Sequence, residues 1–394
     1  MNKLTIKDVD LGGKRIFIRV DFNVPLDDGK VADDTRIVET LPTIKYAVER
    51  KAKVILASHL GRPKGKVVDK YRMDPVAARL SELLGKPVQK LDECVGTEIE
   101  KAVAAMKPGD VVVLENVRFH EQEEANDEHF SEALARLADI YVNDAFGTAH
   151  RAHASTHGIT KFIGKSVAGL LMGKEIEYFT TVLNNPARPF VTILGGAKVS
   201  DKIGAINNLM DKSDRFLIGG GMAYTFLRTQ GHTIGNSLFE EDKVEVARET
   251  LEKAKRLKKG FVLPDDNVVA KKFSEDARTQ ITEGKDINDG WMGLDIGPKT
   301  VALFRENLKD ARTIVWNGPL GAFEMKPFAE GTRGVAEFVA DSGAVSVIGG
   351  GDTAAAMKQF GLSGKMSHIS TGGGASLEIL EGKKLPGIEA LTDK

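Results

Sequence analysis

Short apolar segments alternate with amphipathic segments along the whole chain, and this alternation narrows the possible folds most strongly. Most apolar segments are continuous runs of Val, Ile and Leu, which is typical of strands buried on both faces of a parallel sheet. The predicted strands are 15–22, 53–57, 111–114, 140–142, 190–194, 215–218, 260–263, 313–316, 345–348 and 368–370. The predicted helices are 34–50, 75–84, 128–137, 174–183, 200–210, 241–257 and 331–341. The pattern predicts an α/β fold of doubly wound parallel sheets.

Two domains are expected from the length of the chain. A single hydrophobic core does not usually extend over 394 residues. The best boundary lies within 168–189, where a predicted helix ends in Asn184-Asn185-Pro186 and a second series of strands and helices begins. Most of the 41 glycines also follow this point. We therefore expect a first domain over residues 1–170 and a second domain from residue 171.

Composition excludes several classes of protein. The formal net charge of −1 gives no global attraction to nucleic acid or to an anionic membrane. No apolar run approaches the roughly 18 residues of a membrane span. Cys94 is the single cysteine, so an intrachain disulfide and a cysteine metal site are impossible. Residues 1–10 have no apolar signal-peptide core, and we expect a cytoplasmic protein.

Basic residues follow four predicted strands of the first domain. The ends of parallel strands meet at one edge of a sheet, so these side chains are expected to form one site. Arginine and histidine are suited to a small phosphate or carboxylate. Any one of them alone is better explained as a surface salt bridge, but four strand ends agree. The residues are Arg19 with Asp21 and Asn23 on the same face, Arg36 at the next helix, His59 and Arg62, Arg118, and His150 with Arg151.

Glycine-rich turns follow predicted strands of the second domain. The chain has neither a Walker A loop nor a G-x-G-x-x-G fingerprint. Gly195-Gly196-Ala197-Lys198 is followed by Lys202, which shares a face with Lys198 if the next helix begins early. The turns at 349–352 and 372–374 each join a strand to a helix N-terminus, where free N–H groups attract an anion. The alternative for any one turn is tight strand–helix packing.

Asp352 is informative because a carboxylate beside a phosphate site is repulsive unless Mg²⁺ bridges the two. Glu324 is a candidate for ribose hydroxyls, although alone it is better read as a surface acid. One half suited to a small anion and one suited to a polyphosphate together indicate an enzyme that moves a phosphoryl group between them.

The chain resembles the phosphoglycerate kinase family from end to end. The motifs that carry the resemblance are RVDFNVP (19–25), SHLGRPKG (58–65), LENVRF (114–119), NDAFGTAHRAHAS (143–155), GGAKVSDK (195–202), GGGMAYTF (219–226), GLDIGPK (293–299), 316–324, 349–353 and STGGGASLE (370–378). The resemblance implies a kinase that transfers the acyl phosphate of 1,3-bisphosphoglycerate to MgADP, giving 3-phosphoglycerate and MgATP. It also implies a monomer with two domains facing each other across a cleft. The tail 385–394 is then expected to pack on the first domain, and the second domain to span 171–384.

The resemblance assigns roles residue by residue. Asp21, Asn23, Arg36, His59, Arg62, Arg118 and Arg151 are implied to bind the glycerate and its 3-phosphate, with Arg19 and His150 in the same basic patch. Lys202, Gly293, Glu324, Gly350, Gly351, Asp352 and Thr353 are implied to bind the nucleotide, and Asp352 to hold Mg²⁺. The implied catalytic set is Arg36, Lys198, Gly351 and Gly374.

Such a reaction needs positioning and charge compensation more than a general base. Because the two sites are on separate domains, we expect the domains to close, with the helix near 174–183 and the returning tail as hinges. Two alternatives remain at this point: another small-molecule acyl-phosphate kinase, or a non-enzymatic two-lobed anion-binding protein.

Overall fold

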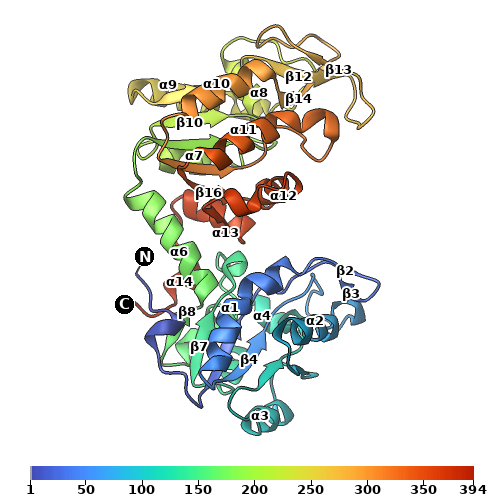
Figure 1. The fold of residues 1–394 in the computed structure, drawn as a ribbon, viewed down its shortest axis with the longest axis vertical. Coiled ribbons are helices and arrows are strands. Elements are labelled where there is room, and N and C mark those ends of the chain that lie inside the picture. The colour runs from blue at the N-terminus through green and yellow to red at the C-terminus, as the bar shows by residue number, and fades with distance from the viewer. Residues whose placement is uncertain (1) are drawn as a thin grey trace. The chain divides into compact units, whose positions relative to one another are not determined.

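The computed structural model describes residues 2–394, which form two compact units (Figure 1). Unit 1 comprises residues up to Glu177 together with Lys384–Lys394, and unit 2 comprises Tyr178–Lys383. Each unit is built on a six-stranded sheet in which all neighbouring strands are parallel.

The sheet of unit 1 has the order β5-β6-β4-β1-β7-β8, and its strands are short and, apart from the edge strand β5, largely buried. A two-stranded hairpin, β2 and β3, follows β1. The strands are β1 (Arg15–Arg19), β2 (Leu26–Asp27), β3 (Lys30–Val31), β4 (Lys53–Ala57), β5 (Gln89–Lys90), β6 (Val111–Val113), β7 (Ile140–Asn143) and β8 (Ser166–Ala168). The helices are α1 (Thr35–Glu49), α2 (Asp74–Leu84), α3 (Thr97–Ala104), α4 (Glu121–Glu124), α5 (Glu128–Ala135) and α14 (Pro386–Glu389).

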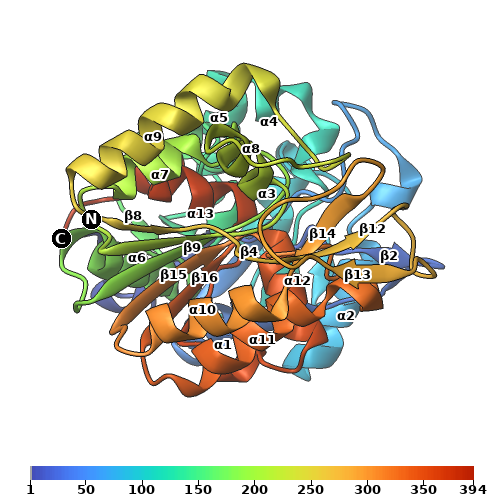
Figure 2. The same ribbon diagram turned by 90° about the horizontal axis from the view of Figure 1, so that it is seen from above.

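The main sheet of unit 2 has the order β11-β10-β9-β15-β16-β17. Helices α7, α8 and α9 cover one face of β9, β15 and β16, and α10 and α11 cover the other (Figure 2). The strands are β9 (Phe190–Leu194), β10 (Arg215–Ile218), β11 (Gly260–Val262), β15 (Thr313–Asn317), β16 (Val345–Gly349) and β17 (His368–Ile369). The helices are α7 (Ile203–Leu209), α8 (Met222–Thr229), α9 (Val244–Arg256), α10 (Pro298–Leu308), α11 (Glu330–Asp341), α12 (Gly351–Gln359) and α13 (Gly373–Leu380).

Unit 2 also contains an antiparallel sheet that the apolar pattern did not predict. Its order is β13-β12-β14, with β12 (Asn267–Ala270), β13 (Thr279–Ile281) and β14 (Met292–Ile296). Every side chain of β13 is exposed, so this strand has no apolar run that a search for buried strands would detect. The parallel sheets and the doubly wound α/β class are as predicted.

The chain passes from unit 1 to unit 2 through α6 (Leu170–Asn184) and returns at Lys383–Lys384. The returning segment pairs with the first residues of the chain: the Leu4 N–H donates to the Thr392 carbonyl at 2.9 Å. The Thr392 N–H donates in turn to the Ser166 carbonyl at 2.8 Å. Both ends of the described chain therefore belong to the β8 edge of unit 1.

Candidate functional site

The basic residues of unit 1 lie in loops that leave one edge of its sheet. β6, β4, β1 and β7 are consecutive in the strand order, so the loops bearing Arg118, His59, Arg19 and Arg151 are neighbours. Parallel strands place these loops at the same carboxyl edge, where α/β proteins bind ligands. The structure thus brings together the four strand ends that the sequence singled out.

The first strand ends earlier than expected, which separates the side chains that were predicted to share a face. β1 stops at Arg19, and the Phe22 N–H then bonds to the Ser58 hydroxyl at 2.8 Å. Asp21 and Asn23 consequently lie in a loop. Asp21 accepts a 3.0 Å hydrogen bond from Arg36, and Asn23 accepts a 2.8 Å bond from the Gly61 N–H.

Arg19 is fully buried and its nitrogens are engaged within the protein. Its Nε donates to the Ser155 hydroxyl at 2.7 Å, and its Nη1 donates to the Val20 carbonyl. Its Nη2 lies 3.3 Å from Nδ1 of His59. The role of Arg19 therefore differs geometrically from that of Arg36, Arg62 and Arg151, which are accessible to a ligand.

Arg118 has unused hydrogen-bonding capacity although it is buried. Its Nε lies 3.3 Å from a Glu124 carboxylate oxygen, and its Nη1 donates weakly to the Gly61 carbonyl at 3.4 Å. Its buried Nη2 has no hydrogen-bond partner within residues 2–394. Burial lowers the pKa of this guanidinium. A buried donor without an acceptor is expensive, so Arg118 is suited to an anion that enters the site.

Asn116 organises this part of the site and was missed from the sequence. Its amide donates to the Leu60 carbonyl at 2.7 Å and to the Tyr71 carbonyl at 3.0 Å, and its oxygen accepts from the Arg118 N–H at 3.1 Å. It thereby joins the loop after β4 to the loop after β6. The sequence places it within LENVRF, but an asparagine there carries no signal of such a clamp.

His59 and His150 differ in the surroundings of their rings. The His59 side chain is 5% exposed, and burial together with Arg19 holds its pKa well below the ordinary value of 6.5. His150 follows the short 3₁₀ turn at Phe146–Thr148 and is partly buried. Arg62 and Arg151 are exposed at the same edge.

The glycine turns of unit 2 fall into two groups. The turns after β9, β10 and β15 pack against one another, because the Gly196 N–H donates to the Pro319 carbonyl at 2.9 Å and the Gly220 N–H donates to the Leu320 carbonyl at 3.0 Å. A Cβ at Gly195 would overlap the Pro319 carbonyl. These glycines are explained by close backbone packing, and the N–H groups of Gly196 and Gly220 are already used.

The turn after β16 has the opposite character. Gly350 has φ +90°, and α12 begins at Gly351, where an added Cβ would meet nothing within 4 Å. The first N–H groups of a helix have no partner within it, so this turn presents free donors and the positive end of the helix dipole. Thr353 is buried, and its hydroxyl accepts a 2.7 Å bond from the Gly318 N–H.

Lys198 and Lys202 do not share a helical face, because α7 begins at Ile203. Lys198 is exposed in the preceding turn. Lys202 is the N-cap residue, and its ammonium donates to Oδ1 of Asn317 at 2.5 Å. Burial lowers the pKa of Lys202. Asn317, which was not predicted from the sequence, is 1% exposed. Its Nδ2 has no hydrogen-bond partner in the described part of the chain.

The remaining predicted nucleotide residues, Gly293 and Glu324, and the predicted catalytic Gly374 lie elsewhere in unit 2. Gly293 is in β14, where its N–H bonds to the Ser237 hydroxyl at 2.9 Å and a Cβ would overlap the Tyr224 ring. Glu324 is exposed beyond the turn after β15, and Gly374 is exposed in the first turn of α13. Gly373 lies close to the Gly351 N–H, so the N-termini of α12 and α13 are adjacent.

Asp352 suits a magnesium ion that arrives with a nucleotide. It is an exposed carboxylate in the first turn of α12, beside free helix N–H groups. No group of three or more His, Cys, Asp or Glu side chains within residues 2–394 is arranged to hold a metal. Mg²⁺ commonly takes one or two carboxylates and completes its shell with substrate phosphates and water, so one carboxylate is a sufficient protein ligand.

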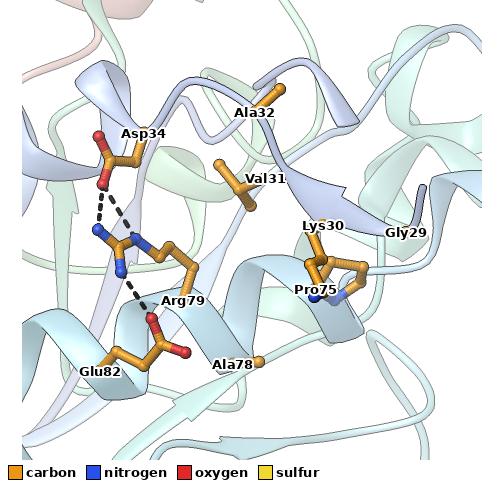
Figure 3. A pocket seen from close by; sticks show the side chains of 9 residues that line it. All are labelled: Gly29, Lys30, Val31, Ala32, Asp34, Pro75, Ala78, Arg79 and Glu82. Carbon is orange, nitrogen blue, oxygen red and sulfur yellow. Dashed lines mark hydrogen bonds and ion pairs between the residues drawn. The ribbon is translucent and has the colours of Figure 1, made fainter. Parts of the chain in front are cut away.

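A hollow of about 470 Å³ lies apart from these residues, between the β2–β3 hairpin and α2 (Figure 3). Arg79 of α2 binds Asp34 through Nε at 3.0 Å and Nη2 at 2.7 Å, and binds Glu82 at 2.6 Å. Asp34 is the residue before α1, which carries Arg36 two positions later. The Arg79–Asp34 pair therefore anchors the start of the helix that presents Arg36.

The family model described as "Phosphoglycerate kinase" matches residues 6–383 of this chain. A phosphoglycerate kinase of Dictyoglomus turgidum is 59% identical over 392 residues, covering 99% of this chain and 98% of the relative. One of Pelotomaculum thermopropionicum is 57% identical over 394 residues, covering both chains completely. The chain belongs to the phosphoglycerate kinase family.

Solved structures of this family have the same fold. A structure of phosphoglycerate kinase from Coxiella burnetii matches with a TM-score of 0.91 at 43% identity, covering 98% of each chain. One from Pyrococcus horikoshii matches with a TM-score of 0.85 at 33% identity, again over 98% of each chain. The family, the fold class and a phosphoglycerate kinase activity, as predicted from the sequence, are confirmed.

No helix within residues 2–394 is both long and apolar enough to cross a membrane.

Proposed function

We propose that this phosphoglycerate kinase family member transfers the acyl phosphate of 1,3-bisphosphoglycerate to MgADP by means of the two strand-edge sites described above. The products are 3-phosphoglycerate and MgATP, and the reaction is reversible, as glycolysis and gluconeogenesis require. The observation that most directly supports one ligand site in each unit is that the two units offer different groups to an anion. Unit 1 offers convergent cations, and unit 2 offers free helix N–H groups beside Asp352.

In unit 1, Arg62, Arg118 and Arg151 bind the 3-phosphate together with His59 and His150. Arg118 is the central member, because it is 4% exposed and keeps a free Nη2 for the ligand. Asp21 and Asn23 accept hydrogen bonds from the glycerate hydroxyl region, and Arg36 reaches the reacting carboxyl end. The Asp21–Arg36 ion pair orders both side chains before the substrate arrives.

In unit 2, Gly350, Gly351, Asp352 and Thr353 form the phosphate end of the nucleotide site, and Lys202 binds a phosphate nearby. Gly293 and Glu324 bind the nucleoside. Asp352 would hold Mg²⁺, which neutralises phosphate charge when bound. Asn317 completes this region by fixing the Lys202 ammonium.

Transfer requires charge compensation and alignment, with no proton to remove from either reacting oxygen. Lys198, Arg36 and the N–H groups of Gly351 and Gly374 are placed in this role. Lys198 is exposed in its turn, and its long side chain can follow the phosphoryl group from one oxygen to the other. A flexible ammonium suits a moving charge better than a rigid guanidinium.

The reaction also requires the ligand of unit 1 to meet the ligand of unit 2, so we propose that the units move together when both are bound. The chain crosses between them at α6 and at Lys383–Lys384, which are the candidate hinges. Small-angle X-ray scattering should show a smaller radius of gyration with both ligands than with either alone. An unchanged radius would contradict this movement.

One copy of the chain carries both proposed sites, so we also propose that the protein is a monomer. We propose that it acts in the cytoplasm.

The activity is tested by mixing the protein with MgATP and 3-phosphoglycerate, trapping the acyl phosphate with hydroxylamine and counting ADP. We expect stoichiometric hydroxamate and ADP that depend on Mg²⁺. 2-Phosphoglycerate and acetate should give neither, which separates this reaction from that of another acyl-phosphate kinase. Failure to turn over 3-phosphoglycerate would contradict the proposal.

A further inference from the structure

A buried polar cluster lies behind the basic edge of unit 1 and has no part in the proposed chemistry. It consists of Arg19, Glu123 and Ser155, and each of these side chains is 0% exposed. Arg19 ends β1, Glu123 lies in α4, and Ser155 lies in the segment that follows β7. Three distant parts of the sequence thus meet at one point beneath the site.

The direction of each hydrogen bond in this cluster is fixed by chemistry. A guanidinium has only donors, so the Ser155 hydroxyl must accept the 2.7 Å bond from Arg19 Nε. Its own hydrogen is then directed to Glu123 Oε1 at 2.6 Å, while the Ser155 N–H donates to Glu123 Oε2 at 2.9 Å. Tyr141 holds Ser155 from the other side by donating to its carbonyl at 2.9 Å.

The cluster is electrically balanced by one cation and one anion. Arg19 Nη2 lies 4.0 Å from Glu123 Oε1. His153 Nδ1 is 3.9 Å from the same oxygen, which is too long for a hydrogen bond. Burial and neighbouring arginines lower the pKa of His153 to about 3, so this ring is neutral at physiological pH. Arg19 is therefore the countercharge of the buried Glu123.

Arg19 also contacts His59. Nη2 of Arg19 lies 3.3 Å from Nδ1 of His59, and the guanidinium can only donate. Nδ1 must therefore present its lone pair, and the ring proton must be on Nε2. The other charged group near Nδ1 is the Asp21 carboxylate, whose Oδ1 is 4.0 Å away and beyond hydrogen-bond distance.

We propose that the Glu123–Ser155–Arg19 cluster acts as a positioning device that holds His59 as the neutral tautomer with its proton on Nε2. The inference rests on the proposed function, in which His59 binds the 3-phosphate. Arg19 acts through His59 and does not contact the substrate, because its nitrogens are already occupied beneath the site.

The consequence is a phosphate-binding histidine that supplies an N–H group without a titrating charge. The cations around His59 act in the same direction, since each of them disfavours an imidazolium. They are Arg19, Arg36, Arg118 and Arg151. Affinity for 3-phosphoglycerate should then show no step from His59 between about pH 6 and pH 8.

The first test reads the tautomer directly. In long-range ¹H–¹⁵N spectra of the ¹⁵N-histidine-labelled full chain, His59 is assigned as the signal missing from His59→Gln. We expect a neutral Nε2–H ring at pH 6 and at pH 8. A neutral Nδ1–H ring or an imidazolium would overturn the proposal. This readout does not depend on turnover, so it also stands if the assigned reaction fails.

The second test removes the device while preserving buried charge balance. The double variant Arg19→Met/Glu123→Gln deletes one cation and one anion together, which avoids leaving either uncompensated. We expect His59 to show mixed tautomers with a raised pKa. We also expect KM for 3-phosphoglycerate to rise about ten-fold, with kcat changed by less than about two-fold. An unchanged His59 signal with unchanged KM would overturn the proposal.

Two further variants guard against a purely structural effect. Ser155→Ala removes the hydroxyl that holds Arg19, and it carries the same test if the double variant does not fold. Ser213→Ala is the matched control, because Ser213 is equally buried in unit 2 and bonds to Thr192 and to the Phe190 and Arg215 carbonyls. It should lower thermal stability without altering the His59 signal or KM. A KM rise in Ser213→Ala equal to that in Ser155→Ala would contradict a specific role.

Discussion

The proposed site residues of unit 1 and those of unit 2 offer different groups to an anion. Unit 1 uses side-chain charges, and these are supported by buried polar groups such as Glu123, Asn116 and Asp144. Unit 2 offers backbone N–H groups at the start of α12, with Asp352 in the first turn of that helix. A compact phosphate is well matched by several converging cations, whereas a chain of phosphates is better followed by a turn of backbone.

The difference shows that a glycine-rich turn does not by itself indicate an anion site. The turns at Gly195, Gly220 and Gly350 look alike in sequence, yet two of them are glycine because backbones approach closely. The third has the free helix terminus that an anion needs. Cations at several neighbouring strand ends point to one ligand edge, whereas each glycine turn has to be judged by its own contacts.

The sharpest test of this contrast is Lys198→Ala, which removes the exposed cation that we propose acts on the transferring group. We expect kcat to fall about 100-fold or more with little change in either KM, as for a contact made in the transition state. Steady-state kinetics with both substrates measure this. Lys255→Ala, an exposed lysine of α9, is the control. Near-normal turnover would remove Lys198 from the mechanism.

The two kinds of glycine turn are separated by Gly195→Ala and Gly351→Ala. A methyl group at Gly195 overlaps the Pro319 carbonyl, so we expect a loss of about 2–3 kcal/mol in stability. At Gly351 a methyl group meets nothing, and stability should hold while KM for ADP rises. Thermal unfolding and kinetics of both variants check this. Equal destabilisation would erase the distinction.

The buried polar layer of unit 1 predicts a pH effect that unit 2's glycine turns lack. Burial raises the pKa of Asp144 from 3.8 to about 7, and its Oδ2 has no hydrogen-bond partner among residues 2–394. The folded chain therefore keeps a proton that the unfolded chain releases. The stability from this group is fully present below 3.8 and is lost as pH rises through about 7.

Asp144→Asn should remove this loss. Relative to the unsubstituted chain, we expect the variant to gain about 2 kcal/mol between about pH 5 and pH 8, seen in thermal unfolding midpoints. Asp276→Asn is the control, because Asp276 is exposed and hydrogen bonds lower its pKa to about 2, outside this window. A constant difference between Asp144→Asn and the unsubstituted chain would refute the assignment.

The smallest expected effect is that of Arg62→Ala in the cationic site. We expect KM for 3-phosphoglycerate to rise about ten-fold, with a weaker dependence on ionic strength, because one of several cations is lost. KM for ADP should stay constant. Arg136→Ala, at an exposed arginine after α5, should leave both KM values unchanged. A rise confined to KM for ADP would place Arg62 outside the substrate site.

The sequence predicted the parallel sheets and the basic strand ends well, because buried strands and strand-end cations leave local signals. It could not predict that β1 would end at Arg19, since the backbone path after β1 depends on the bond from the Phe22 N–H to the Ser58 hydroxyl. Nor could it predict Asn116 or Asn317, whose contacts join loops far apart in the chain. Strand β13 escaped detection because it buries nothing, and β12 (NVVA) and β14 (MGLDI) lack a long run of Val, Ile and Leu.

The pairing of residues 384–394 with the β8 edge has a consequence for biosynthesis. Unit 2 is translated as an insertion, and the segment that completes unit 1 leaves the ribosome after it. The Gly387 N–H bonds to the Ala149 carbonyl at 2.9 Å, beside the loop that carries His150 and Arg151. A nascent chain can therefore finish unit 2 first, while unit 1 waits for residues 384–394.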